Sequence, residues 1–594
     1  MAESCFRMWT NMLRIQLDTL LREALASLPI PGGLEKVATH GCQLERTKDS
    51  KHGDFSTNIA LRLAKSLNQE PRAFAEEVVE SLRPSPLVEK VEIAGPGFIN
   101  FTVAATAYHE EITSILKAGE RYGSSDTGAN CRVLVEYVSA NPTGPLHVGH
   151  GRHAAYGASI SNLLRATGHD VHEEYYVNDA GRQMDILTIS VWFRYTELCG
   201  QFMPFPENAY QGNYVKEIAG TLNNFRGRDF LPDSNDLKKI IEHPNKDSEK
   251  QLDLIIQNIK NLIGLKQFNT VLKLSLETVL KDIKEDLASF GVKPKHWYSE
   301  TSLAESNAIE RALTSLKKKK MIYEKDGATW FRSSNYGDEK DRVVVRENGA
   351  KTYFASDIAY HYDKRKRDYT HLLDVLGADH HGYVARIRAG LQAMGEPAEC
   401  FESLLVQFVT LYRGQVKVQM STRTGEYVTL RELREEVGND AARFFYVSRS
   451  NDQHLDFDLE LAKTQSNDNP VYYIQYAHAR IASMLRQMKE PNINFQSTKN
   501  LALNQLTEAT EHSLMVALSR YPEVVQLASD KRAPQHVVHY LRDTAACFHS
   551  YYNAHRVLVD DPVLRKARVV LVLATQQIIH NGLTLLGVSA PEKM

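Results

Sequence analysis

Cysteine is scarce in this 594-residue sequence, with six copies spread along its whole length. No two of them form a CxxC pair and none lies in a close group with histidine, which are the patterns typical of disulfide frameworks and zinc sites. The cysteines are Cys5, Cys42, Cys131, Cys199, Cys400 and Cys547. The sequence therefore predicts a fold that holds neither zinc nor a disulfide framework.

Long apolar runs are lacking too. The N-terminus has no basic segment followed by a continuous apolar stretch, and no segment approaches the roughly 18 apolar residues that span a bilayer. We therefore expect a cytoplasmic protein with no membrane partner.

Neither sign of charge is in clear excess, because 71 Lys and Arg residues stand against 73 Asp and Glu residues, a formal net charge of −2. A protein that coats nucleic acid without specificity neutralises many phosphates, so that class is disfavoured. Two short basic runs, residues 316–321 and 363–367, are interpreted as solvated surface, the usual place for such runs. Any RNA partner must meet local basic patches.

The chain is too long to fold around one hydrophobic core, since single cores stop growing near roughly 250 to 300 residues. The apolar fraction of 43% and the charged fraction of 24% are ordinary for folded proteins. We expect three or four domains in a multidomain α/β protein.

The residue pattern predicts a parallel sheet in the middle of the chain. A strand over 132–137, a helix from about 150 to 166 and a strand over 171–177 form a right-handed crossover. Later strands of the same sheet are expected at 372–376 and 406–411. Upstream, apolar spacing predicts helices near 12–21 and 59–67, and a Gly-Pro-Gly turn predicts a hairpin over 91–101.

Helical periodicity dominates two further regions. Residues 197–295 form a polar, helical insertion between the halves of the sheet. From Gly438 onward nearly everything reads as a helix bundle, with helices expected at 470–488, 513–528, 535–555 and 563–586.

The strongest chemical signal is the segment 139–150, SANPTGPLHVGH, between a predicted strand and a predicted helix. A helix N-terminus offers unpaired N–H groups and positive dipole charge to a phosphate. His147 and His150 can donate to the same triphosphate, and Gly149, lacking Cβ, would let an adenine ring lie against the backbone. In isolation, the two histidines could equally be satisfied side chains of a glycine-bearing loop.

With its flanking Asn and Pro, this segment resembles the HIGH signature of class I aminoacyl-tRNA synthetases. The second signature of that class, a KMSKS-like loop, matches residues 418–425 only partly. Met420 and Ser421 are kept, whereas Gln419 and Thr422 replace the two lysines. The resemblance implies that Lys417 or Arg423 supplies the missing positive charge, and that bound tRNA helps to organise this loop.

Further stretches resemble the arginyl-tRNA synthetases in particular. They lie at 53–58, 94–101, 135–150, 174–181, 352–360, 377–383, 439–445 and 582–588. Carboxylates suit a planar guanidinium with forked N–H donors. The resemblance assigns Glu136, Tyr353 and Asp357 to the arginine side chain, and the spacing of Tyr353 and Asp357 by one helical turn would let both face one pocket. Without the resemblance, these two residues would read as a solvent-facing helix start.

The resemblance extends to the rest of the substrate site. Asn141 would hold the amino or carboxylate end of arginine, and Asp379 or His380 would border the ATP site. ATP would also contact the histidine signature together with Met420 and Ser421, with Mg²⁺ on its phosphates. Catalysis would rest on positioning and charge stabilisation by His147, His150 and Arg423, without a protein nucleophile.

The resemblance also implies a domain order. Residues 1–115 would be an additional domain that contacts the tRNA elbow, 125–196 and 296–437 the two halves of a Rossmann-type catalytic domain around the insertion 197–295, and 438–594 an all-α anticodon-binding domain. The candidate tRNA contacts are Phe98, Asn100, Tyr551 and Met594. For Phe98 a packed position in the hairpin stays open, and aromatic stripes on helices are usually core.

Two other readings remain open at this stage. A class I synthetase for glutamine or cysteine would share the mechanism, although Glu136 and Asp357 disfavour it. A catalytically idle tRNA-binding paralogue would explain the lost lysines, although the intact His147–His150 segment disfavours it. We expect a monomer whose substrates are L-arginine, ATP and tRNA(Arg).

Overall fold

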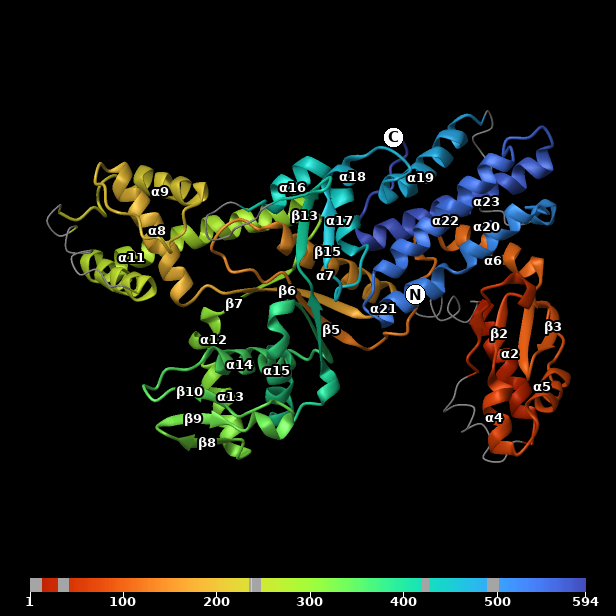
Figure 1. Cartoon of the computed structure of the whole chain (residues 1–594), viewed down its shortest axis with the longest axis horizontal. Helices are drawn as coiled ribbons and strands as arrows, with labels where there is room; N and C mark the ends of the chain where they lie inside the picture. The colour runs from red at the N-terminus through yellow and green to blue at the C-terminus, as the bar shows by residue number, and fades with distance from the viewer. Residues whose placement is uncertain (1–12, 30–41, 234–236, 238–246, 419–426, 489–500) are drawn as a thin grey trace.

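The computed structural model describes the chain except for residues 1–12, 30–41, 234–236, 238–246, 419–426 and 489–500. The molecule is elongated (Figure 1). The N-terminal unit and the C-terminal helices lie at one end, a parallel sheet lies in the middle, and the helices α8, α9 and α11 form the other end.

The N-terminal unit is a small antiparallel sheet covered by helices, with strand order β1-β2-β4-β3. Its elements are α2 (Leu13–Ser27), β1 (Glu45–Arg46), η1 (Ser50–His52), β2 (Phe55–Thr57), α4 (Ile59–Leu67), α5 (Pro71–Glu80), β3 (Val88–Ala94) and β4 (Phe98–Val103). The predicted hairpin is confirmed as β3–β4. Its turn needs Gly97, which has φ 136°, and where a Cβ would lie 2.8 Å from the carbonyl oxygen of Pro71.

Helix α6 (Ala105–Ala118) and the turn η2 (Gly119–Arg121) follow this unit. They pack on the C-terminal helices rather than on the N-terminal sheet: Asn581 donates to the carbonyl oxygen of Gly119 at 2.9 Å, and the ring of Tyr108 meets His512 edge to face at 5.3 Å. An ion pair of 2.9 Å between Arg46 and Glu523 also joins the two ends of the chain.

The central sheet has five parallel strands in the order β12-β11-β5-β6-β7. They are β5 (Arg132–Tyr137), β6 (Asp170–Val177), β7 (His296–Ser299), β11 (His371–Gly377) and β12 (Phe401–Val406), and α7 (Val148–Ala166) connects β5 to β6. The predicted crossover is confirmed, with β5 correct residue for residue. The predicted strand 406–411 is wrong: the sheet strand ends at Val406, and residues from Val409 onward belong to a separate sheet.

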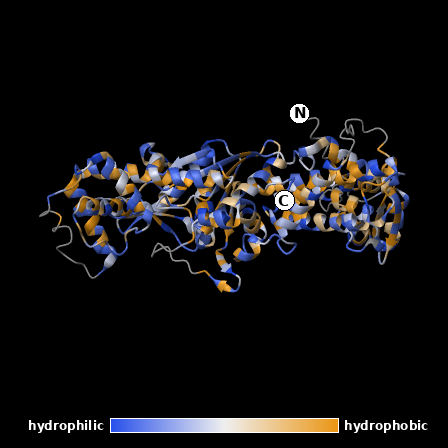
Figure 2. Ribbon diagram, turned by 90° about the horizontal axis from the view of Figure 1, so that it is seen from above, coloured by the Kyte–Doolittle hydropathy of each residue, from blue (hydrophilic) through white to orange (hydrophobic). Residues whose placement is uncertain are grey.

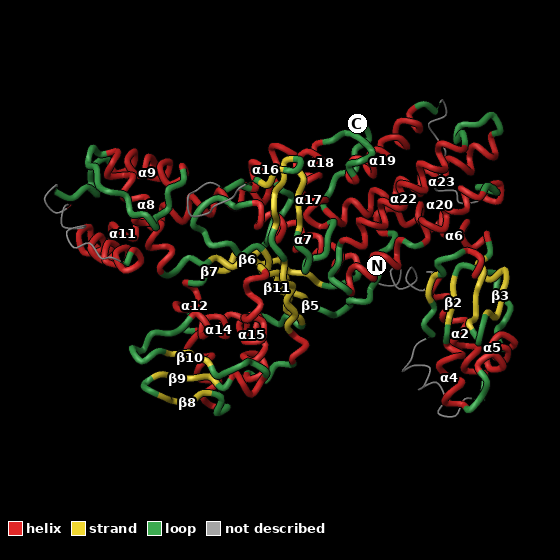
Figure 3. Tube along the Cα trace, in the orientation of Figure 1, coloured by secondary structure: helices red, strands yellow, loops and turns green. Residues whose placement is uncertain are grey.

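Between the sheet strands the chain adds smaller structures. These are α12 (Thr301–Glu305), α13 (Ala308–Lys318), β8 (Ile322–Lys325), β9 (Ala328–Phe331), η3 (Ser333–Tyr336), β10 (Arg342–Val345), α14 (Tyr353–Lys366), η4 (Ala378–His380), α15 (His381–Ala393) and η5 (Ala398–Cys400). Strands β13 (Val409–Arg413), β14 (Val416–Lys417) and β15 (Leu455–Asp458) form a separate three-stranded sheet. Figure 3 shows the strands gathered at these separate places, with helices between them.

In the described residues between β6 and β7, three long helices are present. They are α8 (Arg182–Leu198), α9 (Asn213–Arg226) and α11 (Ser248–Ser289). Helix α11 is interrupted at Gly264, where φ is 76° and ψ is 153°, a conformation open to glycine and not helical.

The C-terminal region is helical, as predicted. Its helices are α16 (Leu430–Val437), α17 (Asn439–Val447), α18 (Leu459–Lys463), α19 (Pro470–Arg486), η6 (Leu503–Gln505), α20 (Ala509–Ser519), α21 (Tyr521–Asp530), α22 (Gln535–Ala554) and α23 (Pro562–Leu586). The single helix predicted over 513–528 is wrong, because Pro522 at the first turn of α21 cannot continue a helix from α20.

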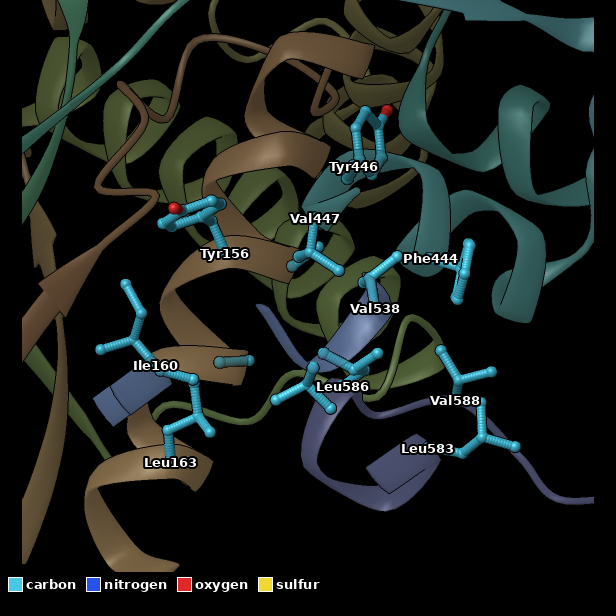
Figure 4. Close-up of a cluster of buried hydrophobic side chains, with 14 of the residues drawn as sticks. Tyr156, Ile160, Leu163, Phe444, Tyr446, Val447, Val538, Leu583, Leu586 and Val588 are labelled. Atoms are coloured by element: carbon cyan, nitrogen blue, oxygen red, sulfur yellow. The ribbon is translucent and has the colours of Figure 1, made fainter. Parts of the chain in front are cut away.

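One apolar core joins the sheet to this bundle. In Figure 4, side chains of α7, α17, α22 and α23 meet in a single buried cluster. Its labelled members are Tyr156, Ile160, Leu163, Phe444, Tyr446, Val447, Val538, Leu583, Leu586 and Val588. Helix α7 therefore carries the histidine segment at one end and rests on the bundle along its length.

Helix α23 corrects one expectation from the sequence. By length and composition alone it could cross a membrane, with a mean hydropathy of 1.5 over its most apolar window, although 67% of that window is buried inside the protein. Its neighbours are α6, α7, α19 and α22. This burial and packing identify α23 as a core helix. Figure 2 shows hydrophobic and hydrophilic residues mixed through the molecule.

Candidate active site

A cavity of about 460 Å³ lies at the carboxyl ends of the central strands, within the size range of small-molecule sites. Ligands of open α/β sheets bind at this edge. The cavity brings together eight of the residues singled out in the sequence: Glu136, Asn141, His147, Gly149, His150, Asp357, Asp379 and His380.

The turn that leaves β5 is strained. Val138 has φ 68° and Ser139 has φ 39°, in a region that β-branched and other non-glycine residues rarely adopt. The hydroxyl of Ser139 accepts from the backbone N–H of Tyr176 at 3.0 Å, and the hydroxyl of Tyr175 donates to the carbonyl oxygen of Ala140 at 2.8 Å. Both bonds come from β6, so the neighbouring strand holds the turn in a conformation that is typical of functional sites.

The two signature histidines form a capping box at the start of α7. Nδ1 of His147 accepts from the backbone N–H groups of Gly149, at 3.1 Å, and His150, at 3.4 Å. Nδ1 of His150 accepts from the backbone N–H of His147 at 3.3 Å. The rings stack with 3.6 Å between their centroids.

These bonds fix the chemical form of both rings. Burial lowers the pKa of His147, and burial together with repulsion from His147 lowers the pKa of His150 well below its ordinary value. Both rings are therefore neutral, and because each Nδ1 accepts a hydrogen bond, the remaining proton lies on Nε2. Each histidine thus offers one Nε2–H donor.

Two details of this segment differ from, or add to, the sequence analysis. A Cβ on Gly149 would lie 2.9 Å from the His147 ring, so this ring covers the face of Gly149 on which the sequence analysis expects the adenine ring.

His153 also lines the cavity, and burial lowers its pKa to about 4. The signal for His153 was its spacing of three residues from His150, which places both on one helix face.

The opposite part of the cavity is acidic. Glu136 is buried near the end of β5, and Asp357 lies in the first turns of α14. Burial raises the pKa of Asp357 to about 6, with a further upward contribution from Glu136, while a hydrogen bond from Tyr383 acts in the opposite direction. A cation beside Asp357 would stabilise its charged form.

Sequence reasoning missed two further carboxylates: Asp374, which lines the cavity, and Glu300, which lies near Asp357 although the described cavity lining does not include it. Burial raises the pKa of Glu300 to about 7, and repulsion from Asp357 and Asp179 adds to the shift. Asp179 itself accepts hydrogen bonds from the hydroxyls of Ser299 and Thr301, at 2.5 and 2.9 Å. Glu300 follows β7 in the chain and carries no motif, so only the pairing of β6 with β7 brings it to this place.

The basic run 363–367 was interpreted as solvated surface, and for Lys364 this is wrong. Its side chain is 0% exposed, and its Nζ lies 2.5 Å from Glu136 Oε2 and 2.9 Å from Asp374 Oδ1. Periodicity alone could not show this, because the two carboxylates come from strands β5 and β11.

Tyr353 is not brought to the cavity in this structure. It is the first residue of α14, it is 66% exposed, and the described cavity lining does not include it. The expectation that Tyr353 and Asp357 face one pocket is therefore not met here.

The candidate RNA-contacting residues fall into two groups. Phe98 is 40% exposed at the start of β4, which removes the reading that it is a packed core residue, and Met594 is 54% exposed. Asn100 is buried in β4, where its side-chain oxygen accepts from Ser56 at 2.7 Å. Tyr551 is 0% exposed, which argues against the expectation that it contacts a base.

The residues that follow the KMSKS-like loop are described by the structure. Gln419, Met420, Ser421, Thr422 and Arg423 lie outside the described residues. After the loop, the backbone N–H of Leu430 donates to the carbonyl oxygen of Leu146 at 2.8 Å, and that of Val148 donates to Val428 at 3.2 Å. The loop therefore ends directly beside the histidine segment.

Among the described residues, no group of three or more His, Cys, Asp or Glu side chains could hold a metal ion. Mg²⁺ commonly binds through substrate phosphates, water and one or two carboxylates. Asp379, an exposed carboxylate of the cavity lining, fits that limited role.

This site and this fold match known families. The model for the class I tRNA synthetase catalytic domain of the arginine type matches residues 111–216 and 235–481, that for the arginyl-tRNA synthetase N-terminal domain matches 16–103, and that for the DALR anticodon-binding domain matches 474–594. The parallel sheet with a histidine segment after its first crossover strand thus defines a class I aminoacyl-tRNA synthetase.

Individual relatives narrow the class further. The chain is 53% identical over 586 residues to an arginine–tRNA ligase of Thioalkalivibrio sulfidiphilus, covering 98% of this chain and 100% of the relative. It is 52% identical to one from Coxiella burnetii, covering 98% and 99%. The solved Thermus thermophilus arginyl-tRNA synthetase shares its fold, with a TM-score of 0.74, 22% identity and coverage of 98% and 100%. The chain belongs to the arginyl-tRNA synthetase family.

Proposed function

We propose that the acidic and histidine ends of the cavity divide the reaction of an arginine–tRNA ligase between them. The enzyme activates L-arginine with ATP to arginyl-adenylate, releases diphosphate, and transfers arginine to tRNA(Arg) with release of AMP. The observation that carries the assignment is the meeting of Glu136 and Asp357 with His147 and His150 in one cavity.

The guanidinium of arginine binds at the acidic end. Asp357 and Glu136 accept its N–H donors, and the charge of Glu300 adds to the attraction. The negative charge of these carboxylates favours a ligand of charge +1. Asn141, also in the cavity lining, holds the amino or carboxylate end of arginine. Tyr353 contributes only if its ring turns toward Asp357 when arginine binds.

ATP binds at the histidine end, over the N-terminus of α7. The neutral Nε2–H groups of His147 and His150 donate to phosphate oxygens, and Asp379 borders the nucleotide. The arginine carboxylate attacks the α-phosphate in line, and the chain contributes positioning and charge stabilisation. Met420 and Ser421 contribute to ATP binding and Arg423 to stabilisation of the diphosphate charge, as the resemblance to the family implies.

Mg²⁺ bound to the ATP phosphates supplies further neutralisation of their charge. The position of Asp379 in the cavity lining supports a role in accepting hydrogen bonds from the water shell of this ion. Zinc has no role in this proposal.

The tRNA lies along one side of the elongated molecule. Phe98 stacks on an unpaired base at the tRNA elbow, a mode of RNA recognition suited to an exposed aromatic ring. The exposed Met594 and the C-terminal bundle meet the anticodon. The domain limits 1–115, 125–196, 197–295, 296–437 and 438–594 follow this division of roles, and the enzyme acts as a cytoplasmic monomer.

The test is arginine-dependent exchange of diphosphate into ATP, measured with all twenty amino acids, with and without tRNA. We expect exchange with arginine alone among them, and far faster exchange when tRNA is present. Exchange driven by glutamine or cysteine would contradict the substrate assignment, and no exchange under any condition would indicate a tRNA-binding paralogue.

A further inference from the structure

Three carboxylates form a row across the central sheet. In the parallel register, Asp374 of β11 is the partner of Glu136 of β5, and Glu136 is the partner of Glu174 of β6. Register partners on neighbouring strands point to the same face, about 4.8 Å apart. All three side chains are buried. Such a row repels itself unless cations neutralise it.

Helix α14 supplies a polar partner for each carboxylate at a matching spacing, two of them the cations Lys364 and Arg367. His361, Lys364 and Arg367 lie three residues apart on one helix face. His361 Nε2 lies 2.7 Å from Asp374 Oδ2, and Arg367 donates to both oxygens of Glu174, at 2.5 and 3.0 Å.

Lys364 stands at the centre and bridges Glu136 to Asp374. We call these six residues, Asp374, Glu136, Glu174, His361, Lys364 and Arg367, the charge ladder.

Three members of the charge ladder, Glu136, Asp374 and His361, line the cavity, whereas Glu174 is absent from its described lining. Both carboxylate oxygens of Asp374 are already bonded, Oδ1 to Lys364 and Oδ2 to His361. Oε2 of Glu136 accepts from Lys364 Nζ at 2.5 Å, and it lies 2.8 Å from the hydroxyl of Tyr360, whose one proton it shares with Glu174 Oε1 at 2.7 Å. In the described part of the chain, Oε1 of Glu136 receives no hydrogen bond. One carboxylate oxygen is thus fixed and the other is left for a ligand.

We propose that Lys364 is a positioning residue for arginine recognition, which fixes Glu136 Oε2 and thereby aims Glu136 Oε1 at the guanidinium. This inference rests on the proposed role of Glu136 in binding arginine. Lys364 does not touch the substrate. It acts through Glu136, and it also ties α14, the helix that carries Asp357, to the sheet.

The local charge count supports this role. Lys364 is fully buried and makes no contact with solvent, so it is dedicated to its two carboxylates. Without it, Glu136 and Asp374 would be buried neighbours of like charge, and Glu136 would either turn away or take up a proton. Both outcomes weaken a contact to guanidinium and leave the ATP end of the cavity unchanged.

The experiment measures KM for arginine, KM for ATP and kcat for aminoacylation in Lys364→Met, Glu136→Gln and the double variant. Methionine keeps the length and apolar character of the lysine stem. We expect Lys364→Met to raise KM for arginine by about tenfold or more, the scale of a lost charge-assisted contact, with KM for ATP within about twofold. In the Glu136→Gln background the same change should add almost nothing, because it acts through Glu136.

Arg367→Met is the matched control. It also removes a cation from the charge ladder, but its partner Glu174 does not line the described cavity. A merely structural role of Lys364 would lower stability in both variants and leave the KM for arginine similar in both. A selective rise in Lys364→Met therefore supports positioning.

The outcomes separate the inference from its premise. If Glu136→Gln leaves KM for arginine unchanged, the assignment of Glu136 fails and the inference fails with it. If Glu136→Gln raises that KM but Lys364→Met does not, or if their effects simply add, the inference alone is overturned.

Removal of one partner from a buried ion pair can unfold a protein. For that case the variant Lys364→Met with Asp374→Asn keeps the charge balance, compared with Asp374→Asn alone. It should show the same selective rise in KM for arginine. An unchanged KM in this variant would overturn the proposal.

Discussion

Replacement of Asp357 by asparagine tests the acidic end of the cavity directly. The change removes one negative charge and keeps the side-chain volume. A hydrogen bond to a charged group contributes about 1.5 to 3 kcal/mol, which corresponds to about one to two orders of magnitude in arginine affinity. The KM for ATP should change little, because the histidines that hold ATP lie at the other end of the cavity.

The pKa of Asp357 adds a second prediction to the same experiment. Burial raises this pKa to about 6, so the charged form that binds guanidinium is lost as the pH falls through that value. A group of that pKa is about nine-tenths ionised at pH 7 and about one quarter ionised at pH 5.5, so KM for arginine should rise about fourfold over this interval. The asparagine variant should lose this contribution.

The assay is steady-state aminoacylation with arginine varied at saturating ATP and tRNA, repeated from pH 5.5 to 8. Asp363→Asn is the matched control, since Asp363 lies on the same helix, pairs with Arg367 and does not line the described cavity. An unchanged KM for arginine in Asp357→Asn, or an equal rise in the control, would refute the assignment of Asp357. A collapse of ATP dependence in its place would show that the two ends are assigned wrongly.

Further predictions follow from the same structure. Removal of residues up to 112 would cut through α6, which packs on the bundle. A variant that begins after residue 103 should therefore keep a folded catalytic unit but bind tRNA more weakly at fixed salt. Unaltered tRNA affinity would count against an elbow-binding role. Phe98→Ala should weaken tRNA binding by about 1 to 3 kcal/mol, the scale of one stacked base, without changing arginine–ATP kinetics; equal loss in both would point to misfolding. Arg423→Ala should lower kcat more than it raises KM for ATP, because its charge matters mainly in the transition state, and a fully active variant would exclude this role. Tyr551→Phe should leave anticodon recognition intact and stability unchanged or higher, since the hydroxyl of Tyr551 is buried and has no hydrogen-bond partner among the described residues; specific loss of tRNA binding would restore it as an RNA contact.

The sequence was most informative where a strong local pattern carries the structure. The strand β5 and the helix α7 follow from an apolar, β-branched run, helical spacing and the Asn-Pro and Gly residues between them. The histidine segment could be assigned for the same reason, because its chemistry depends on the helix N-terminus that it builds itself. His153 was within reach of the same argument but lies one turn beyond the motif.

The expectations from the sequence that the structure does not support share one cause: they depend on tertiary packing, which a local pattern does not show. Residues 406–411 are mostly apolar, and a local pattern cannot show that Val406 ends one sheet while Val409 begins another. Tyr551 and Tyr552 are adjacent aromatic residues of α22, and the sequence pattern does not show that only Tyr551 is fully buried. Helix α23 is apolar enough for a membrane, and only its packing partners show that it is a core helix.

The sequence alone determined the family, the order of the main elements and the residues of the histidine segment, because these depend on neighbours along the chain. Only the tertiary structure decided which charges are buried. Lys364 belongs to a run that reads as surface, and it becomes the centre of a buried charge ladder because α14 packs across β11, β5 and β6. Burial of a charged side chain is set by partners distant in sequence, and those partners meet only when the whole sheet has formed.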